Sequence, residues 1–269
     1  MTRRALFPLS MLAFGYAFLY LPIAVLMVYS FNDNRLVAVW GEFSTRWYGE
    51  LFRNAQIGEA LWLSLRVAAV SATASVVLGT LAAFAMRRAG RLAVRGAFEA
   101  LAMAPLILPE VLTGLSLLVL FVMLSELIGW PATRGATTIT LAHITFGTAY
   151  AIVVIRARLS QLDPRLEEAA ADLGATPWRT FLRVTLPLLA PAMIAAWLLA
   201  FTLSLDDVVI ASFVTGPGAS TLPIVIFSSV RLGVSPQINA LATLMVLGVA
   251  ALISVAMLTL WRAERRSAQ

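Results

Sequence analysis

Cysteine and lysine are both missing from the 269-residue chain, and charged residues make up only 13% of it. Without cysteine there is no disulfide, no thiol nucleophile and no zinc or iron–sulfur site built on thiolates. Without lysine a Walker A loop cannot form, because its lysine holds the nucleotide phosphates. Histidine occurs once. The sequence therefore predicts no catalytic centre, no metal site and no cofactor, and it excludes ATP hydrolysis by a Walker A loop in this chain.

Apolar residues, by contrast, are in large excess. They make up 60% of the chain and the mean hydropathy is +0.87, whereas a soluble domain is nearer half apolar and a quarter charged. One core cannot hide this excess, so we expect much of the surface to face a lipid bilayer. The net charge of +6 could suggest nucleic-acid binding, and the positions of the arginines decide that question.

Long apolar segments predict six membrane-spanning helices, because about 20 apolar residues cross a bilayer. Four run without interruption, over residues 6–31, 60–86, 137–155 and 240–261. Two contain prolines: residues 97–124, broken at Pro105 and Pro109, and residues 188–213, opening at Pro187 and Pro191. The first segment, about 26 residues long, exceeds the 7–15-residue apolar core of a signal peptide and is expected to be retained. The predicted fold is all-α, a single membrane domain over residues 1–269.

The arginines fix the predicted orientation. With the N-terminus inside, fourteen of the 20 basic residues fall in cytoplasmic segments, five fall outside and Arg66 lies within the second span. This asymmetry follows the positive-inside rule through six crossings. Both termini are therefore expected in the cytoplasm, and topology accounts for the basic balance without nucleic acid. The inner arginines are Arg3, Arg4, Arg87, Arg88, Arg91, Arg95, Arg156, Arg158, Arg165, Arg179, Arg183, Arg262, Arg265 and Arg266, and the outer ones are Arg35, Arg46, Arg53, Arg134 and Arg231.

The cytoplasmic loop between the fourth and fifth spans, residues 156–187, predicts two short helices. Asp163 is a suitable N-cap ahead of a proline, and Gly174 is a natural stop for the first helix. Thr176 then caps a second helix, which leads back into the membrane near Pro187.

The first of these helices carries small and acidic residues. Residues 169–171 are three alanines, which let another protein surface approach closely. Glu168 and Asp172 lie four residues apart and share one face, while Glu167 and Glu168 lie near the positive end of the helix dipole. These features fit two alternatives equally well: a helix that docks on a soluble partner, and a helical hairpin that lies on the lipid headgroups.

The same loop resembles the E-A-A signature of binding-protein-dependent ABC importer permeases. That signature reads E-A-A, three residues, G, nine residues and I-x-L-P; here it is Glu168-Ala169-Ala170, Gly174 and Val184-Thr185-Leu186-Pro187, with valine for isoleucine. The resemblance implies a type I ABC importer membrane domain in a bacterial inner membrane, whose loop helix docks on a cytoplasmic ATPase. The residues it implies in ATPase coupling are Glu167, Glu168, Ala169, Ala170, Asp172, Gly174, Leu186 and Pro187.

Other segments are similar to polyamine permeases, above all to the second permease subunit of putrescine importers. They are Pro109-Glu110-Val111, Leu205-Asp206-Asp207, residues 212–217 and residues 234–243. The resemblance implies transport of putrescine, with spermidine or another small solute left open. It also implies a second similar permease chain, two ATPase subunits and an extracytoplasmic binding protein as partners.

Carboxylates in the predicted spans give a candidate path for a cation, because an acid inside a bilayer is costly and is usually functional or paired. Glu110 follows two prolines in the third span and could bind a cation or pair with Arg66. Asp206 and Asp207 lie near the outer end of the fifth span, where they could bind substrate or merely end the helix in water.

An aromatic face beside these aspartates would suit an alkylammonium ion. Trp197 and Ser204 share a helix face, with Asp207 about a quarter turn away. We therefore predict a substrate pathway made of Glu110, Trp197, Ser204, Asp206 and Asp207. His143, the lone histidine, is expected to form hydrogen bonds within the packing.

The loop after the first span predicts a short helix, capped by Ser44, with Trp40, Trp47 and Tyr48 as anchors at the membrane interface. Together with an expected helix over residues 221–233, it is the predicted landing surface for an extracytoplasmic partner.

One rival reading comes from another functional class. An ion-coupled secondary transporter could use the same carboxylates without partner chains, but such proteins often show repeated halves, which this sequence lacks. A membrane enzyme would have no residues to carry its chemistry.

Overall fold

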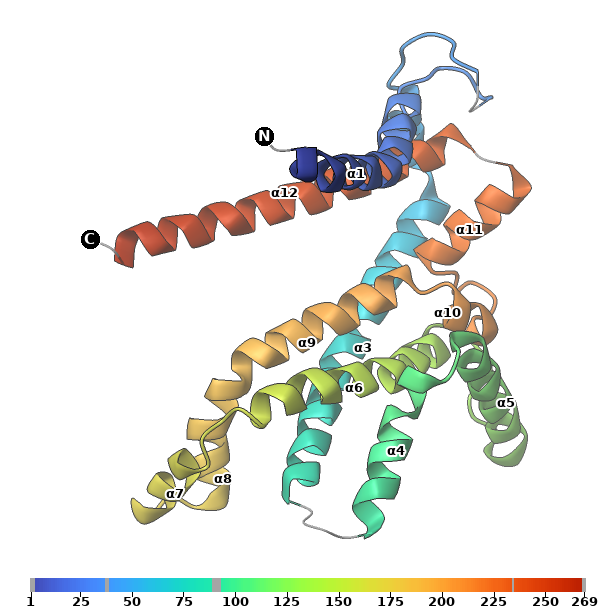
Figure 1. Cartoon of the computed structure of the whole chain (residues 1–269). Coiled ribbons are helices and arrows are strands. Elements are labelled where there is room, and N and C mark those ends of the chain that lie inside the picture. Colours follow the sequence, from blue (N-terminus) through green and yellow to red (C-terminus); the bar gives the residue numbers. More distant parts are fainter. Residues whose placement is uncertain (1–2, 37–38, 89–92, 234, 268–269) are drawn as a thin grey trace. The chain divides into compact units, whose positions relative to one another are not determined.

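The computed structural model describes residues 3–36, 39–88, 93–233 and 235–267, which are helical apart from their connections and one isolated antiparallel bridge between Asn32 and Phe43. The elements in chain order (Figure 1) are α1 (Arg3–Tyr29), α2 (Arg46–Arg53), α3 (Ala55–Arg88), α4 (Ala93–Ile107), α5 (Glu110–Ile128), α6 (Ala136–Leu159), α7 (Arg165–Asp172), α8 (Pro177–Thr180), the π-helical turn η1 (Phe181–Thr185), α9 (Leu186–Asp206), α10 (Val209–Val214), α11 (Leu222–Leu232) and α12 (Pro236–Ser267).

Five helices in the described part of the chain are long and apolar enough to cross a membrane: Phe7–Tyr29, Ala55–Arg87, Glu110–Ile128, Ala136–Leu159 and Pro177–Asp206. The sixth predicted span falls within α12, of which Pro236–Ala251 is found as a shorter apolar helix. The all-α prediction is confirmed, and the count of six spans stays a prediction.

The chain divides into two compact units, Met1–Gly58 with Ile226–Gln269, and Glu59–Val225. In the first unit α12 packs against α1 and α2. Within the N-terminal helix α1, no residue of the Phe7–Tyr29 segment is buried in the isolated chain, and several aromatic rings lie on its surface. Such a surface is stable only in an apolar surrounding, as expected for a membrane-spanning helix.

In the second unit α6 and α9 lie side by side, and α5 packs against α10 (Figure 1). Close packing of α3 on α6 depends on Gly79, because a Cβ atom there would lie 2.7 Å from the Cβ of Ala151. Small residues at helix contacts are typical of membrane bundles, where close backbone approach replaces the hydrophobic effect as the source of association.

The third predicted span, residues 97–124, is a pair of helices rather than one kinked helix. The chain leaves helical geometry between α4 and α5, where Pro109 has an extended backbone with ψ of 139°. Proline lacks an N–H group and disfavours helical geometry in the preceding residue, Leu108. Glu110 consequently begins α5 and does not lie within a continuous span.

The fifth span also differs from its predicted limits, residues 188–213. The second loop helix does not end before the membrane, because α8, η1 and α9 form one continuous helix over Pro177–Asp206. The wider turn η1 ends at Thr185, two residues before Pro187, and a π turn is one way for a helix to accommodate a proline. At the far end the helix stops at Asp206, since Asp207 has extended geometry.

Candidate coupling helix and acidic pathway

Local capping defines both ends of α7. The Asp163 carboxylate accepts a hydrogen bond from the Arg165 N–H at 3.0 Å, although the helix begins one residue later than predicted. At the other end Gly174 has φ of +80°, and the N–H groups of Gly174 and Ala175 donate to the carbonyls of Ala171 and Ala170. This is the Schellman arrangement, which requires a left-handed residue at that position. The prediction that Gly174 stops the helix is confirmed.

The second predicted cap is also present. The Thr176 hydroxyl accepts from the Arg179 N–H at 3.4 Å, with Pro177 at the first helical position. Because Gly174 and Thr176 are only two residues apart, the chain reverses in a tight connection between α7 and the long helix (Figure 1). The predicted coupling element is therefore a compact helix–turn–helix.

The predicted coupling residues divide into two groups. Glu168 and Asp172 are exposed, as their shared face predicts. Ala169, Gly174 and Pro187 are exposed as well, and Ala170 and Leu186 are half-buried. Glu167 turns toward the protein instead, where its Oε1 atom contacts both Arg87 and Thr185. Adjacent glutamates in one motif thus have different surroundings.

Exposed apolar side chains add to the solvent-facing surface of this helix–turn–helix. Leu173 is 89% exposed and Trp178 is also largely exposed. A leucine and a tryptophan facing solvent beside an acidic helix face are suited to cover by a protein partner. The sequence prediction missed both residues, and it also missed Arg87 and Thr185 as the contacts of Glu167.

The predicted acidic pathway does not form one cluster. Glu110 is exposed at the start of α5 and, among the described residues, neither it nor Arg66 forms an ion pair. The alternative in which these two residues pair with each other is therefore not observed. Asp206 is exposed at the end of α9.

Asp207 has a different environment, because its carboxylate is held by the protein. It accepts hydrogen bonds from the N–H groups of Ile210 and Ala211 at 3.1 and 2.7 Å, which caps α10. His143 Nε2 lies 3.1 Å from the same carboxylate. The hydrogen bonds expected of His143 are thus present, and they occupy a side chain that the sequence assigned to substrate.

Serines extend this network into the helix packing. Ser71 donates to Ser204 at 3.3 Å, and the Ser204 hydroxyl lies 2.6 Å from His143 Nδ1. If Ser204 donates to Nδ1, the proton on Nε2 faces Asp207, so every polar atom in the chain of contacts is satisfied. Helices α3, α6, α9 and the start of α10 are joined by this buried polar chain.

Trp197 faces the same side of α9 as Ser204. Its indole Nε1 donates to Thr73 of α3 at 3.0 Å, and its ring stacks on Phe201 with centroids 4.9 Å apart. Asp207 lies beyond the helix, so the expected quarter-turn relation does not apply to it. Glu110 and Asp206 are the exposed members of the predicted pathway.

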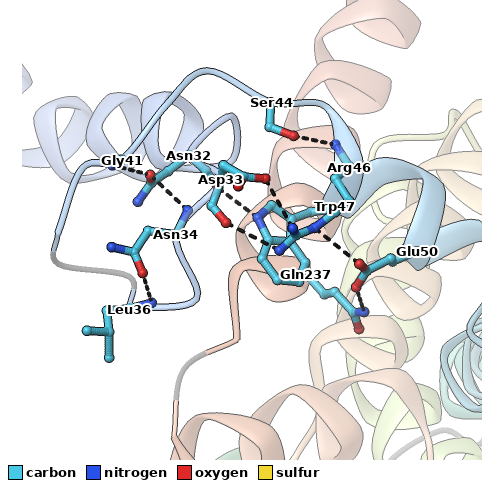
Figure 2. A network of polar contacts seen from close by, with 10 residues as sticks. All are labelled: Asn32, Asp33, Asn34, Leu36, Gly41, Ser44, Arg46, Trp47, Glu50 and Gln237. Atoms are coloured by element: carbon cyan, nitrogen blue, oxygen red, sulfur yellow. Dashed lines mark hydrogen bonds and ion pairs between the residues drawn. The ribbon is translucent and has the colours of Figure 1, made fainter.

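A second polar network holds the connection between α1 and α3 (Figure 2). The Asn32 side chain accepts from the N–H groups of Asn34 and Gly41 at 3.2 and 2.8 Å, and it donates to the Val39 carbonyl. Trp47 donates from its ring nitrogen to the Asn32 carbonyl at 2.7 Å. Asn32 therefore fixes the conformation of this loop through hydrogen bonds from its side chain and its carbonyl group.

Arg46 and Gln237 complete this loop network. Arg46 forms ion pairs with Asp33 and Glu50, both at 3.3 Å, and Gln237 at the start of α12 donates to Glu50 (Figure 2).

The predicted interface anchors of this loop have different roles in the structure. Trp47 is 4% exposed and Tyr48 shares a hydrogen bond with Ser30, so both belong to the packing of the loop. The anchor role predicted for Trp47 was wrong, because its ring is buried and donates a hydrogen bond to Asn32, and that of Tyr48 stays a prediction. Trp40 remains largely exposed, and the expected second helix is present as α11.

Comparison with known proteins places these features in a family. The family model described as "Binding-protein-dependent transport system inner membrane component" matches residues 75–267. The putrescine transport system permease protein PotI of Escherichia coli (strain K12) is 56% identical over 95% of this chain and 91% of that protein. The spermidine/putrescine transport system permease protein PotC of the same strain is 41% identical over 86% and 84% of the two chains.

Solved structures agree on the fold. A bacterial ABC transporter that imports the acidic polysaccharide alginate aligns with a TM-score of 0.73 at 18% identity, covering 96% of this chain and 95% of that one. The MetNI methionine ABC transporter aligns with a TM-score of 0.62 at 16% identity, covering 82% and 99%. Because the family model matches residues 75–267 and a known permease is 56% identical, the chain belongs to the binding-protein-dependent transport system inner membrane components, which are multi-pass permeases of ABC importers.

Proposed function

We propose that this chain is one permease subunit of an ATP-driven importer of putrescine in the bacterial inner membrane. The observation that carries the substrate is the 56% identity, over 95% of the chain, with a putrescine permease. The chain has no Walker A lysine, so the energy must come from a partner. The exposed acidic and small-residue face of α7 supports docking of that partner, an ATPase.

The assembly that follows has four kinds of chain. Two ATPase subunits bind the α7 elements of this permease and of a second, similar permease, and a binding protein delivers the substrate from the opposite side. The arginine distribution supports this arrangement, because the six-span topology predicted from it, with both termini in the cytoplasm, would put α7 on the ATPase side.

The proposed pathway for the diamine includes two carboxylates that the chain's own helices leave uncovered. Glu110 and Asp206 are exposed in the isolated chain and are free of ion pairs among the described residues. Two carboxylates at separate positions suit a substrate with two ammonium groups. Trp197, Ser204 and Asp207 support that pathway by holding α9 and α10 against α3 and α6.

Uptake by the purified importer in lipid vesicles tests the function. We expect putrescine uptake that requires ATP and all partner chains, with spermidine competing less well. Uptake by this permease alone under an ion gradient would favour the secondary transporter and overturn the proposal.

Amide substitutions test the pathway. Glu110→Gln and Asp206→Asn should each lower the rate of putrescine uptake about tenfold, the effect of losing about 1.4 kcal/mol of ion pairing, while the complex still assembles. Glu126→Gln, another exposed acid on α5, is the matched control and should transport normally. Normal uptake by both pathway variants would refute the acidic pathway.

A further inference from the structure

One carboxylate ties the coupling helix α7 to the helices beside it. Oε1 of Glu167 lies 3.0 Å from Arg87 Nη1, near the end of α3, and accepts a hydrogen bond from the Thr185 hydroxyl at 3.0 Å. Thr185 is 1% exposed and ends η1, the turn that leads into α9. A single oxygen atom therefore joins α7, α3 and the start of a membrane helix.

Apart from its contacts with the neighbouring turns α8 and η1, little else holds α7 in place. The helix has eight residues and none of them is buried, and so short a helix has little stability of its own in water. Within the described part of the chain, Glu167 is the only side chain of α7 that forms an ion pair or hydrogen bond with another helix. The position of α7 thus depends on this contact more than on apolar packing.

The space at the root of α7 is open. A cleft of about 330 Å³ is lined by Arg87, Arg156 and Pro164, with Ala83, Leu159, Ser160 and Leu162 completing its wall. Arg156 pairs with Glu99 of α4 at 2.9 Å, so the far side of the cleft is fixed independently of α7. Because no packing fills this cleft, side-chain packing there does not set the angle at which α7 leaves the membrane domain.

We propose that Glu167 is a positioning residue that transmits movement of α7 to α3 and α9. This inference rests on the proposed function. Docking and transmission are divided between neighbouring side chains: Glu168, Ala169 and Asp172 face the ATPase, and Glu167 faces its own chain. Movement of α7 then pulls on Arg87 at the end of α3 and on Thr185 at the start of α9.

The coupling ratio of the assembled importer tests this role. In Glu167→Gln we expect the amount of ATP hydrolysed per putrescine imported to rise about threefold, within the range for a partly exposed ion pair, with the ATPase still co-purifying. Glu99→Gln breaks the other ion pair beside the cleft without touching α7 and should keep the wild-type ratio. The charge exchange Arg87→Glu with Glu167→Arg restores the pair and should bring the ratio back toward the wild type.

A spin label gives a second measurement that does not depend on transport. Since the chain has no cysteine, Leu173→Cys introduces a unique labelling site at the exposed end of α7. The label should become more mobile in Glu167→Gln and in Thr185→Val, but not in Glu99→Gln.

Two results would overturn the inference. The first is a wild-type coupling ratio together with unchanged label mobility in Glu167→Gln. The second is loss of the ATPase from that variant while the label mobility stays unchanged, which would mean that Glu167 contacts the ATPase directly. If the wild-type importer itself does not take up putrescine, the proposed function fails, and the label mobility still decides whether Glu167 holds α7.

Discussion

The connection between α1 and α3 and the connection between α6 and α9 are both held by polar contacts, but they differ in how deeply these contacts are buried. In the first, Asn32 is 1% exposed and lies at the centre of a set of hydrogen bonds closed by Trp47. In the second, α7 has no buried residue and relies on Glu167.

The difference shows what each connection does without partners. Buried hydrogen bonds in a loop fix one conformation, because breaking any of them leaves an unsatisfied polar group away from water. A short, exposed helix tied by one carboxylate can change its angle at low cost. The first connection therefore needs no partner to hold its conformation, and we expect the second to be fixed fully only when the proposed ATPase covers α7.

The largest effect should come from breaking the buried loop. Trp47→Ala removes a core ring and its hydrogen bond to Asn32, and it should destabilise the protein by about 3–5 kcal/mol. Thermal unfolding of the purified chain in detergent measures this loss. Trp40→Ala is the matched control, since Trp40 is 46% exposed, and it should change the midpoint little. Equal midpoints for the two variants would contradict the claim that the loop has a core of its own.

Features whose energetics lie within a few residues were predictable from the sequence. Asp163, Gly174 and Thr176 each act through neighbouring backbone groups, so a short stretch of sequence contains both members of every contact. The apolar segments likewise predicted the long helices, because bilayer thickness sets their length.

Contacts between distant segments could not be predicted in this way. Thr185 and Arg87 meet Glu167 only after three helices have packed, and nothing in the sequence between them specifies that pairing. The same holds for His143 and Asp207, which are 64 residues apart.

A smaller effect should separate the two adjacent aspartates. In Asp207→Asn, one of the two capping N–H groups faces an amide donor, and the contact with His143 is weakened. The substitution should therefore lower the free energy of unfolding by about 2 kcal/mol and the unfolding midpoint by about 4–8 °C. Asp206→Asn, the exposed neighbour, should leave the midpoint unchanged. A thermal scan of both variants in one detergent checks this, and equal midpoints would show that the buried network does not stabilise the fold.

The smallest effect on stability should come from the exposed connection, at Gly174. Alanine at this position must adopt φ near +80°, which costs about 1–2 kcal/mol for a residue with a Cβ atom. Because α7 has no buried residue, fraying of its last turn relieves this strain. Gly174→Ala should therefore leave the unfolding midpoint nearly unchanged yet reduce the amount of ATPase that co-purifies with the permease. Gly58→Ala is the control, since a Cβ atom there meets nothing within 4 Å inside α3. Full retention of the ATPase by Gly174→Ala would mean that the docking surface does not need the Schellman turn, and that α7 is shaped by its partner rather than presented to it ready-formed.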